Sequence, residues 1–337
     1  MFPRIAILIA LIALPVFCED WNPRLAADYL DSRQKEWFAW APAKREGGPC
    51  VSCHTGLGYL LARPGLRRAL GESQPTPYEK GMLEGLAARA GKKEPANLLG
   101  VEAIFSALFL ALRDSKNEDT KRALDRLWPF QIREGKDKGA LRWFDAELDP
   151  WETPDATFYG SALAALAAGA APAEYRDQPA VRESLNELTE YLQREQQTQP
   201  LHNRVALMWA ASGLPTVMPK PMRKSLIKEI AGKQQPDGGW TTESLGPWKA
   251  HAEAPLSAGS NSYATAFVAF ALQKGGVSRS NPTLVRALTW LKSHQDRQSG
   301  SWPAESMNKQ YTPGSMQARF MQDAASEFAT LALLEAR

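Results

Sequence analysis

The sequence predicts an all-α fold in which six helical hairpins close into an (α/α)6 toroid. A polar helical pattern followed by a helix rich in small apolar residues recurs along the chain, and runs with β-type alternation are absent. Two linking segments are near copies, Lys233-Gln-Gln-Pro-Asp-Gly-Gly-Trp240 and His294-Gln-Asp-Arg-Gln-Ser-Gly-Ser-Trp302. A ring is favoured over an open solenoid because it leaves no apolar end repeat exposed.

Each hairpin has a polar outer helix and an apolar inner helix. The outer helices are expected at about 23–40, 76–91, 116–134, 178–196, 219–234 and 281–294. The inner helices are expected to start near residues 55, 102, 157, 203, 264 and 325. In the fourth outer helix, Leu185, Leu188 and Leu192 form one apolar stripe at helical spacing. The small side chains of the inner helices allow close backbone approach inside the ring.

The linking segments from Gln235 to Trp240, and from Gln295 or Gln298 to Trp302, resemble the QW motifs of the squalene–hopene cyclase and protein prenyltransferase superfamily. The resemblance implies that the Gln caps a helix end and the Trp stacks against it. The Asp-x-Asp-Asp acid motif of the cyclases is absent. We interpret the acidic residues between 145 and 155 as a solvated loop in which Asp155 caps the next helix. They are Asp145, Glu147, Asp149, Glu152 and Asp155.

The N-terminus indicates export. Residues 1–18 combine a positive start at Arg4, an apolar run too short to span a bilayer, and a small residue at Cys18. We expect a signal peptide cleaved after Cys18, with lipidation of Cys18 as the alternative. Residues 19–337 would then form a single toroid domain, secreted or periplasmic, without a membrane span. Loss of Arg4 lowers the net charge from +3 to +2, which gives no support for a nucleic-acid partner.

Cys50-Val-Ser-Cys53-His54 has the spacing of a c-type heme attachment motif. Two thiols separated by two residues reach the two vinyl groups of one porphyrin, and the adjacent His54 supplies the proximal iron ligand. This stretch resembles cytochromes c, and the predicted cofactor is one covalent heme c. Zinc is the alternative cofactor, since Cys53-His54-Thr-Gly resembles the Cys-His-Gly of lanthionine cyclases. A Cys50–Cys53 redox disulfide is a further alternative.

Ring closure would bring the last repeat beside His54. Met307 and Met316 are therefore candidate distal iron ligands, with Met321 in the same last segment. His251 is the other candidate, because the loop before the fifth inner helix is expected at the same mouth of the ring. His202, at the start of the fourth inner helix, is expected at the same mouth of the ring. Each of these residue types is also common as plain packing or as a polar loop residue.

Together these features predict an exported heme c protein in electron transfer or another redox role, with a redox partner in the periplasm. No catalytic residue is predicted, because the cyclase acid motif is missing. One alternative is an enzyme of the cyclase or prenyltransferase class, or a zinc-dependent toroid enzyme. Another alternative is a non-catalytic binding module.

Overall fold

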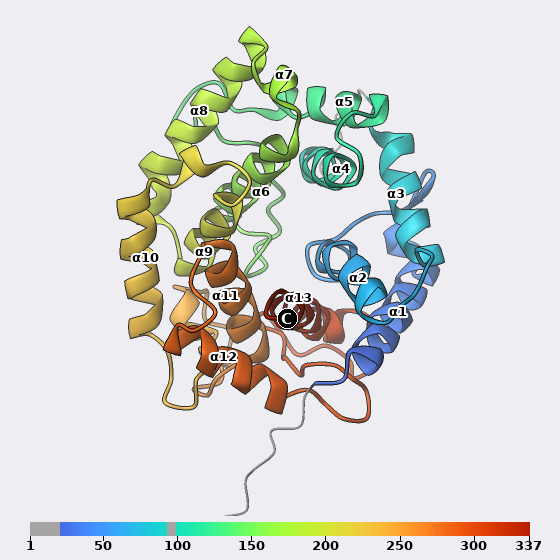
Figure 1. The fold of residues 1–337 in the computed structure, drawn as a ribbon, viewed down its shortest axis with the longest axis vertical. Helices are drawn as coiled ribbons and strands as arrows, with labels where there is room; N and C mark the ends of the chain where they lie inside the picture. The colour runs from blue at the N-terminus through green and yellow to red at the C-terminus, as the bar shows by residue number, and fades with distance from the viewer. Residues whose placement is uncertain (1–20, 93–98) are drawn as a thin grey trace, which may run out of the picture.

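A computed structural model of the chain describes residues 21–92 and 99–337. Within them the fold is an all-α toroid with an inner and an outer layer of helices, which confirms the predicted fold class (Figure 1). The signal-peptide prediction for residues 1–18 lies outside the described residues, and the domain division at residue 18 stays a prediction. In the described part of the chain, no helix is long and apolar enough to cross a membrane.

The two layers alternate along the chain. The outer helices are α1 (Pro23–Ala39), α3 (Pro77–Arg89), α5 (Glu118–Asp125), α8 (Pro179–Glu195), α10 (Lys220–Gly232) and α12 (Pro282–Ser293). The inner helices are α2 (Leu57–Ala69), α4 (Leu99–Arg113), α6 (Ala156–Ala170), α9 (Leu201–Ala210), α11 (Ser262–Lys274) and α13 (Phe320–Glu335). The short α7 (Ala173–Arg176) and a hairpin of β1 (Lys44–Arg45) and β2 (Gly48–Pro49) complete the order.

Most predicted outer helices match the structure closely because their start signals are local. The side chains of Asn22 and Asn281 accept hydrogen bonds from the first turns of α1 and α12, each followed by a proline at the first helical position. Thr76 and Glu79 form a reciprocal capping box at the start of α3. The helix expected over 116–134 is the exception: α5 ends at Asp125, shortly before Pro129, which cannot continue a helix.

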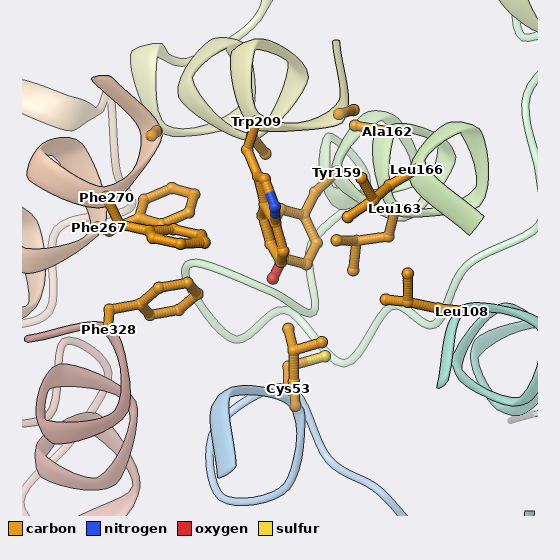
Figure 2. Close-up of a cluster of buried hydrophobic side chains, with 14 of the residues drawn as sticks. Cys53, Leu108, Tyr159, Ala162, Leu163, Leu166, Trp209, Phe267, Phe270 and Phe328 are labelled. Atoms are coloured by element: carbon orange, nitrogen blue, oxygen red, sulfur yellow. The ribbon is translucent and has the colours of Figure 1, made fainter. Parts of the chain in front are cut away.

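Aromatic rings fill the centre of the ring. Phe267 and Phe328 pack edge to face with their centroids 4.9 Å apart, and Trp209 contacts Phe328 from the neighbouring helix. Figure 2 shows Tyr159 in the same cluster and Cys53 pointing toward it. The small residues of α6 and α11 let these large rings meet, since both helices are buried along almost their whole length.

Three glutamines tie outer helices together by one repeated contact. The side-chain amides of Gln131, Gln234 and Gln295 each donate to a glycine carbonyl in their own loop, at 3.0, 2.8 and 3.0 Å. Each also donates to a backbone oxygen of the next outer helix or its cap, those of Ser184, Thr283 and Asn22. We call this double contact the Gln brace. The glycines, Gly139, Gly238 and Gly300, all have positive φ, which favours glycine.

The Gln brace corrects the sequence analysis in one detail. Gln234, and not Gln235, makes the contact before Trp240. In the last repeat Gln295 forms the Gln brace, and its acceptor is the carbonyl of Asn22, which caps α1. This brace therefore helps to close the ring. The indoles of Trp240 and Trp302 donate to Ile230 and Leu291 at the ends of the preceding outer helices. These contacts fit a structural role for both motifs.

The inner helices pack in an almost continuous ring. Successive contacts run from α4 through α6, α9, α11 and α13 to α2, and α13 also packs on α1. Figure 1 shows α2 and α4 apart. A cavity lies on this side of the ring, lined by α1, the loop before α2, α3, α4 and the loop before α6. The site described below opens at this place.

Candidate active site

The motif residues 50–54 lie in the loop that leads from the β-hairpin into α2, and α1 fixes this loop. The indole of Trp37 donates to the carbonyl of Cys50 at 2.8 Å, and the amide of Gln34 donates to the carbonyl of Thr55. The backbone N–H of Cys50 donates to Ala43 at 2.8 Å. The backbone of the motif is thereby held against the first helix.

Cys50 and Cys53 are both free thiols, and burial raises the pKa of each. Cys53 belongs to the central core, whereas Cys50 is half-buried. Within residues 21–92 and 99–337, no three His, Cys, Asp or Glu side chains gather as a metal-binding group. Covalent heme c on these cysteines, with zinc as the alternative cofactor, stays a prediction.

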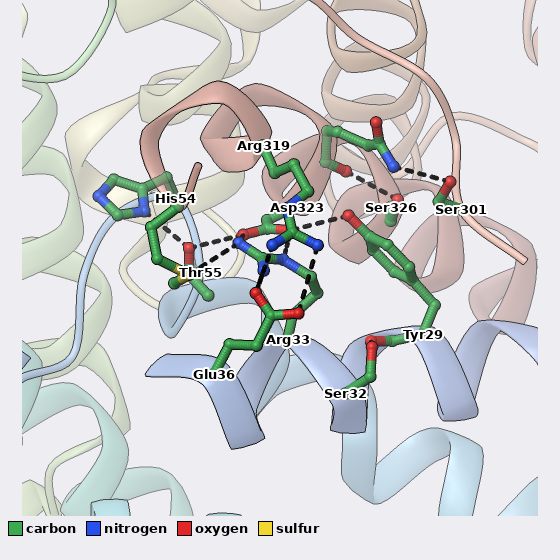
Figure 3. A network of polar contacts seen from close by, with 12 residues as sticks. Tyr29, Ser32, Arg33, Glu36, His54, Thr55, Ser301, Arg319, Asp323 and Ser326 are labelled. Carbon is green, nitrogen blue, oxygen red and sulfur yellow. Dashed lines mark hydrogen bonds and ion pairs between the residues drawn. The ribbon is translucent and has the colours of Figure 1, made fainter. Parts of the chain in front are cut away.

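His54 is buried and its ring is tightly enclosed. The imidazole stacks on Phe320 with the ring centroids 3.6 Å apart and meets the edge of Trp37. Its Nδ1 lies 2.8 Å from Oγ1 of Thr55, which donates in turn to Asp323 (Figure 3). Burial, with the nearby charge of Arg33, lowers the pKa of His54 to about 3, so the ring is neutral at physiological pH.

A cavity of about 440 Å³ opens beside this histidine, between α1, the loop before α2, α4 and the loop before α6. That volume falls in the range of small-molecule sites, roughly 300–1,000 Å³. Its walls combine aromatic side chains with two glutamates and one arginine. The aromatic residues are Trp37, Trp40, Phe105, Trp143 and Phe144, and the charged ones are Arg45, Glu102 and Glu152.

A second cavity of about 150 Å³ adjoins the first. His54 and Glu152 line both cavities. The second cavity is otherwise lined by the loop before α6 and by the last repeat, including Trp151, Phe320 and Met321. The two cavities therefore adjoin at a histidine and a carboxyl group, and we refer to both together as the candidate cleft.

Glu152 has a fixed backbone and an unpartnered side chain. Its N–H donates to Leu148 at 2.9 Å, and its carbonyl accepts from Ala146 and Leu148. In the part of the chain that the structure describes, no hydrogen bond or ion pair reaches its half-buried carboxyl group. Burial alone raises the pKa of Glu152, which favours the protonated acid.

Glu102 has the opposite environment. Its carboxylate accepts a charge-assisted hydrogen bond from the guanidinium of Arg89 on α3. Arg89 is itself buried and also donates to the carbonyl of Glu46 in the β-hairpin. One cleft thus holds an uncompensated carboxyl group and an ion-paired carboxylate.

The candidate distal ligands lie in three different places. The sulfur of Met316 is 3.3 Å from Nη2 of Arg33, Met307 is buried in the core, and His251 lies in the loop near Asp149. Met321 borders the smaller cavity with His54. His202 lies in the core, with Nε2 2.8 Å from the hydroxyl of Tyr263, and burial lowers its pKa to about 4. The three distal-ligand assignments stay predictions.

The structure also corrects the interpretation of the acidic loop. Glu152 faces the cleft, so the loop is not simply solvated, and Asp155 makes no side-chain capping bond to α6. Sequence reasoning named Glu152 without giving it a role and did not single out Glu102. The separate environments of the two glutamates come from contacts distant in sequence, which local patterns do not reveal.

Comparisons with known proteins give similar folds but no family. No protein-family model matches the chain, and no curated protein sequence matches it. An α-1,6-mannanase of family GH76 from Salegentibacter sp. HEL1_6 is similar over 93% of this chain and 100% of its own, with TM-score 0.55 and 12% identity. A polysaccharide lyase is similar over 93% of this chain and 96% of its own, with TM-score 0.55 and 14% identity. A glycosyl hydrolase family 88 protein from Bacteroides vulgatus is similar over 94% of this chain and 99% of its own, with TM-score 0.57 and 12% identity.

These comparisons confirm the toroid and contradict the predicted function. The similar structures are carbohydrate-cleaving toroid enzymes, so the prediction of a heme protein in electron transfer is corrected. The alternatives, a terpene cyclase, a zinc-dependent enzyme or a binding module, find no support in them either. The physical reason is that the Cys50–His54 spacing is a local feature, whereas the cavities beside it are built by segments far apart in the sequence.

Proposed function

We propose that this protein is a glycoside hydrolase that cleaves a neutral glycan in the candidate cleft between α4 and the loop before α6. The observation that carries the proposal is the pair of glutamates with different environments in one aromatic cleft. Glycoside hydrolysis requires a carboxylic acid that protonates the leaving oxygen and a second carboxylate that acts as base or nucleophile. Two proteins of similar fold, an α-1,6-mannanase and a glycosyl hydrolase of family 88, support hydrolysis of a glycosidic bond as the reaction.

Glu152 is the general acid in this proposal. Burial raises its pKa, no neighbouring cation opposes that shift, and its side chain borders both cavities. A glycosidic oxygen placed at the boundary of the two cavities would lie beside this carboxyl group. Activity should fall as pH rises through the raised pKa, because the acid must be protonated to donate.

Glu102 is the second carboxylate. Its carboxylate is held in the wall of the larger cavity by the ion pair with Arg89. A variant of the GH76 mannanase with two adjacent aspartates replaced by asparagine is inactive. The present chain contains no two adjacent aspartates, so its two carboxyl groups come from separate elements, α4 and the loop before α6.

The charge and shape of the cleft favour a neutral sugar. Among the described residues that line the larger cavity, Arg45 is the only cation available to bind the carboxylate of a uronic acid. Trp40, which is half-buried and packs on the buried Trp37 with ring centroids 5.3 Å apart, offers an apolar face on which a sugar ring can stack. If residues 1–18 direct export, as the sequence predicts, the substrate is an extracellular or periplasmic glycan.

The test is an assay of the purified protein for reducing ends released from mannan, xylan and β-glucan. We expect hydrolysis of at least one, and a loss of roughly 10²–10⁴-fold in kcat for Glu152→Gln. Glu147→Gln is the matched control, because Glu147 lies in the same loop but is 75% exposed. It should keep the wild-type rate.

Any of three results would overturn the proposal. The first is that no glycan of the panel is bound or cleaved, and the second is full activity of the Glu152→Gln variant. The third is a protein that carries a chromophore in this cleft, seen as a Soret band after purification, because the group would then occupy the sugar site.

A further inference from the structure

The buried polar network behind His54 has no role in the proposed acid–base pair. We infer that Thr55 and Asp323 are positioning residues that hold His54 as the Nδ1–H tautomer and leave Nε2 as a hydrogen-bond acceptor in the cleft. The inference rests on the proposed function for its consequence in catalysis, but the tautomer is measurable without any substrate.

The argument starts at Asp323, which is buried on α13 and receives four donors. Nε and Nη2 of Arg33 lie 2.7 and 3.0 Å from its two carboxylate oxygens. The hydroxyls of Tyr29 and Thr55 donate to the same group at 2.8 and 2.9 Å. Burial raises the pKa of Asp323, but the bidentate guanidinium favours the charged form, which has no proton to give.

The charge on Asp323 decides which atom donates in the hydrogen bond between Thr55 and His54. The single hydroxyl proton of Thr55 points to Asp323, because a charged acceptor binds it more strongly than a neutral ring nitrogen does. Oγ1 therefore presents a lone pair to Nδ1 of His54, 2.8 Å away. Two lone pairs at that distance would repel, so Nδ1 must carry the ring proton. Ser52 lies farther from the same nitrogen, at 3.3 Å, and accepts from the N–H of Thr55.

The second ring nitrogen is then an acceptor. Nε2 forms no hydrogen bond with the residues that the structure describes, and Figure 3 shows it pointing away from the Thr55–Asp323 network. His54 lines both cavities, and its ring is packed between Phe320 and Trp37. A neutral acceptor at the boundary of the two cavities suits a sugar hydroxyl or the attacking water.

The experiment is a two-dimensional NMR spectrum of the side-chain nitrogens in protein labelled with ¹⁵N-histidine. His54→Gln identifies the His54 signals among those of the four histidines. We expect the Nδ1–H tautomer in the wild type at neutral pH. Thr55→Val keeps the side-chain shape but removes the acceptor, so the population should shift to the Nε2–H form. Thr55→Ser keeps the hydroxyl and should restore the wild-type tautomer.

An Nε2–H tautomer in the wild type, or an unchanged tautomer in a folded Thr55→Val variant, would overturn the inference. In the glycan assay, Thr55→Val should raise KM or lower kcat by roughly 10-fold, the loss of one hydrogen bond of about 1.4 kcal/mol, and Thr55→Ser should recover it. If the tautomer behaves as expected and no glycan is cleaved, the proposed function fails while the positioning role stands.

Discussion

Nε of Arg33, on the first helix, lies 2.7 Å from Oδ1 of Asp323, on the last helix, and each side chain is 1% exposed. The pair joins the two ends of the ring at the point where the candidate cleft begins. Arg33 also pairs with Glu36, which in turn pairs with Arg319 (Figure 3). Ring closure and the orientation of His54 therefore depend on the same buried charges.

Breaking this pair should destabilise the protein strongly. Arg33→Met leaves the Asp323 carboxylate buried without its cation, and we expect a loss of about 3–5 kcal/mol in the free energy of unfolding. The double variant Arg33→Met with Asp323→Leu should lose less free energy of unfolding than the two single variants lose together. Urea unfolding of the two single variants and the double variant measures these losses. Arg24→Met is the control, since its partly exposed pair with Glu72 should contribute less than about 1 kcal/mol; equal losses would contradict this account.

Glu327 should make the protein less stable as pH rises. Its carboxyl group is buried, Oε2 has no partner within the described residues, and burial followed by the charge of Asp323 raises its pKa well above the usual range. The folded state thus prefers the protonated form. Its contribution is complete below the unfolded pKa, about 4.3, and is lost as pH rises toward the folded value.

Glu327→Gln removes this titration, so the decline in unfolding free energy as pH rises above the unfolded pKa of about 4.3 should flatten. Exposed Glu190→Gln provides the control, and its pH dependence should follow the wild type. Identical slopes for Glu327→Gln and the wild type would show that Glu327 does not titrate with folding.

Trp40→Ala should weaken glycan binding. The half-buried indole lines the larger cavity, where it can stack on a sugar ring. Loss of one such contact of about 0.5–1.5 kcal/mol raises KM roughly 2- to 10-fold with little change in kcat. Trp40→Phe keeps an aromatic face and should retain most of the affinity. A fall in kcat alone would assign Trp40 a different role.

Gln295→Ala should loosen the closure of the ring. The side-chain amide donates to Gly300 and to Asn22 at 3.0 Å each, and its oxygen accepts from the N–H of Asn22. At about 0.5–1.5 kcal/mol for each bond, thermal unfolding should show a loss of roughly 2–4 kcal/mol. Gln298→Ala, in the same loop but exposed, should have no effect; comparable losses in both variants would rule out the Gln brace as the cause.

The fold was predictable because its signals are local. Helical spacing and the Asn–Pro and Thr–Pro starts define the outer helices, and small residues identify the inner ones. The site was less predictable. Burial of Glu152 and the Arg89–Glu102 pair arise from segments distant in sequence, and Gln235 was named where its neighbour Gln234 makes the brace. A one-residue shift of this kind depends on how the helix before it ends.

The most direct test of the central claim is mass spectrometry of the products formed from a neutral oligosaccharide in H₂¹⁸O. Hydrolysis at Glu152 and Glu102 predicts one ¹⁸O atom in each new reducing end from the wild type, and loss of that product in Glu152→Gln. Products without ¹⁸O, or unchanged product from Glu152→Gln, would contradict the assignment of this cleft as a glycoside hydrolase site.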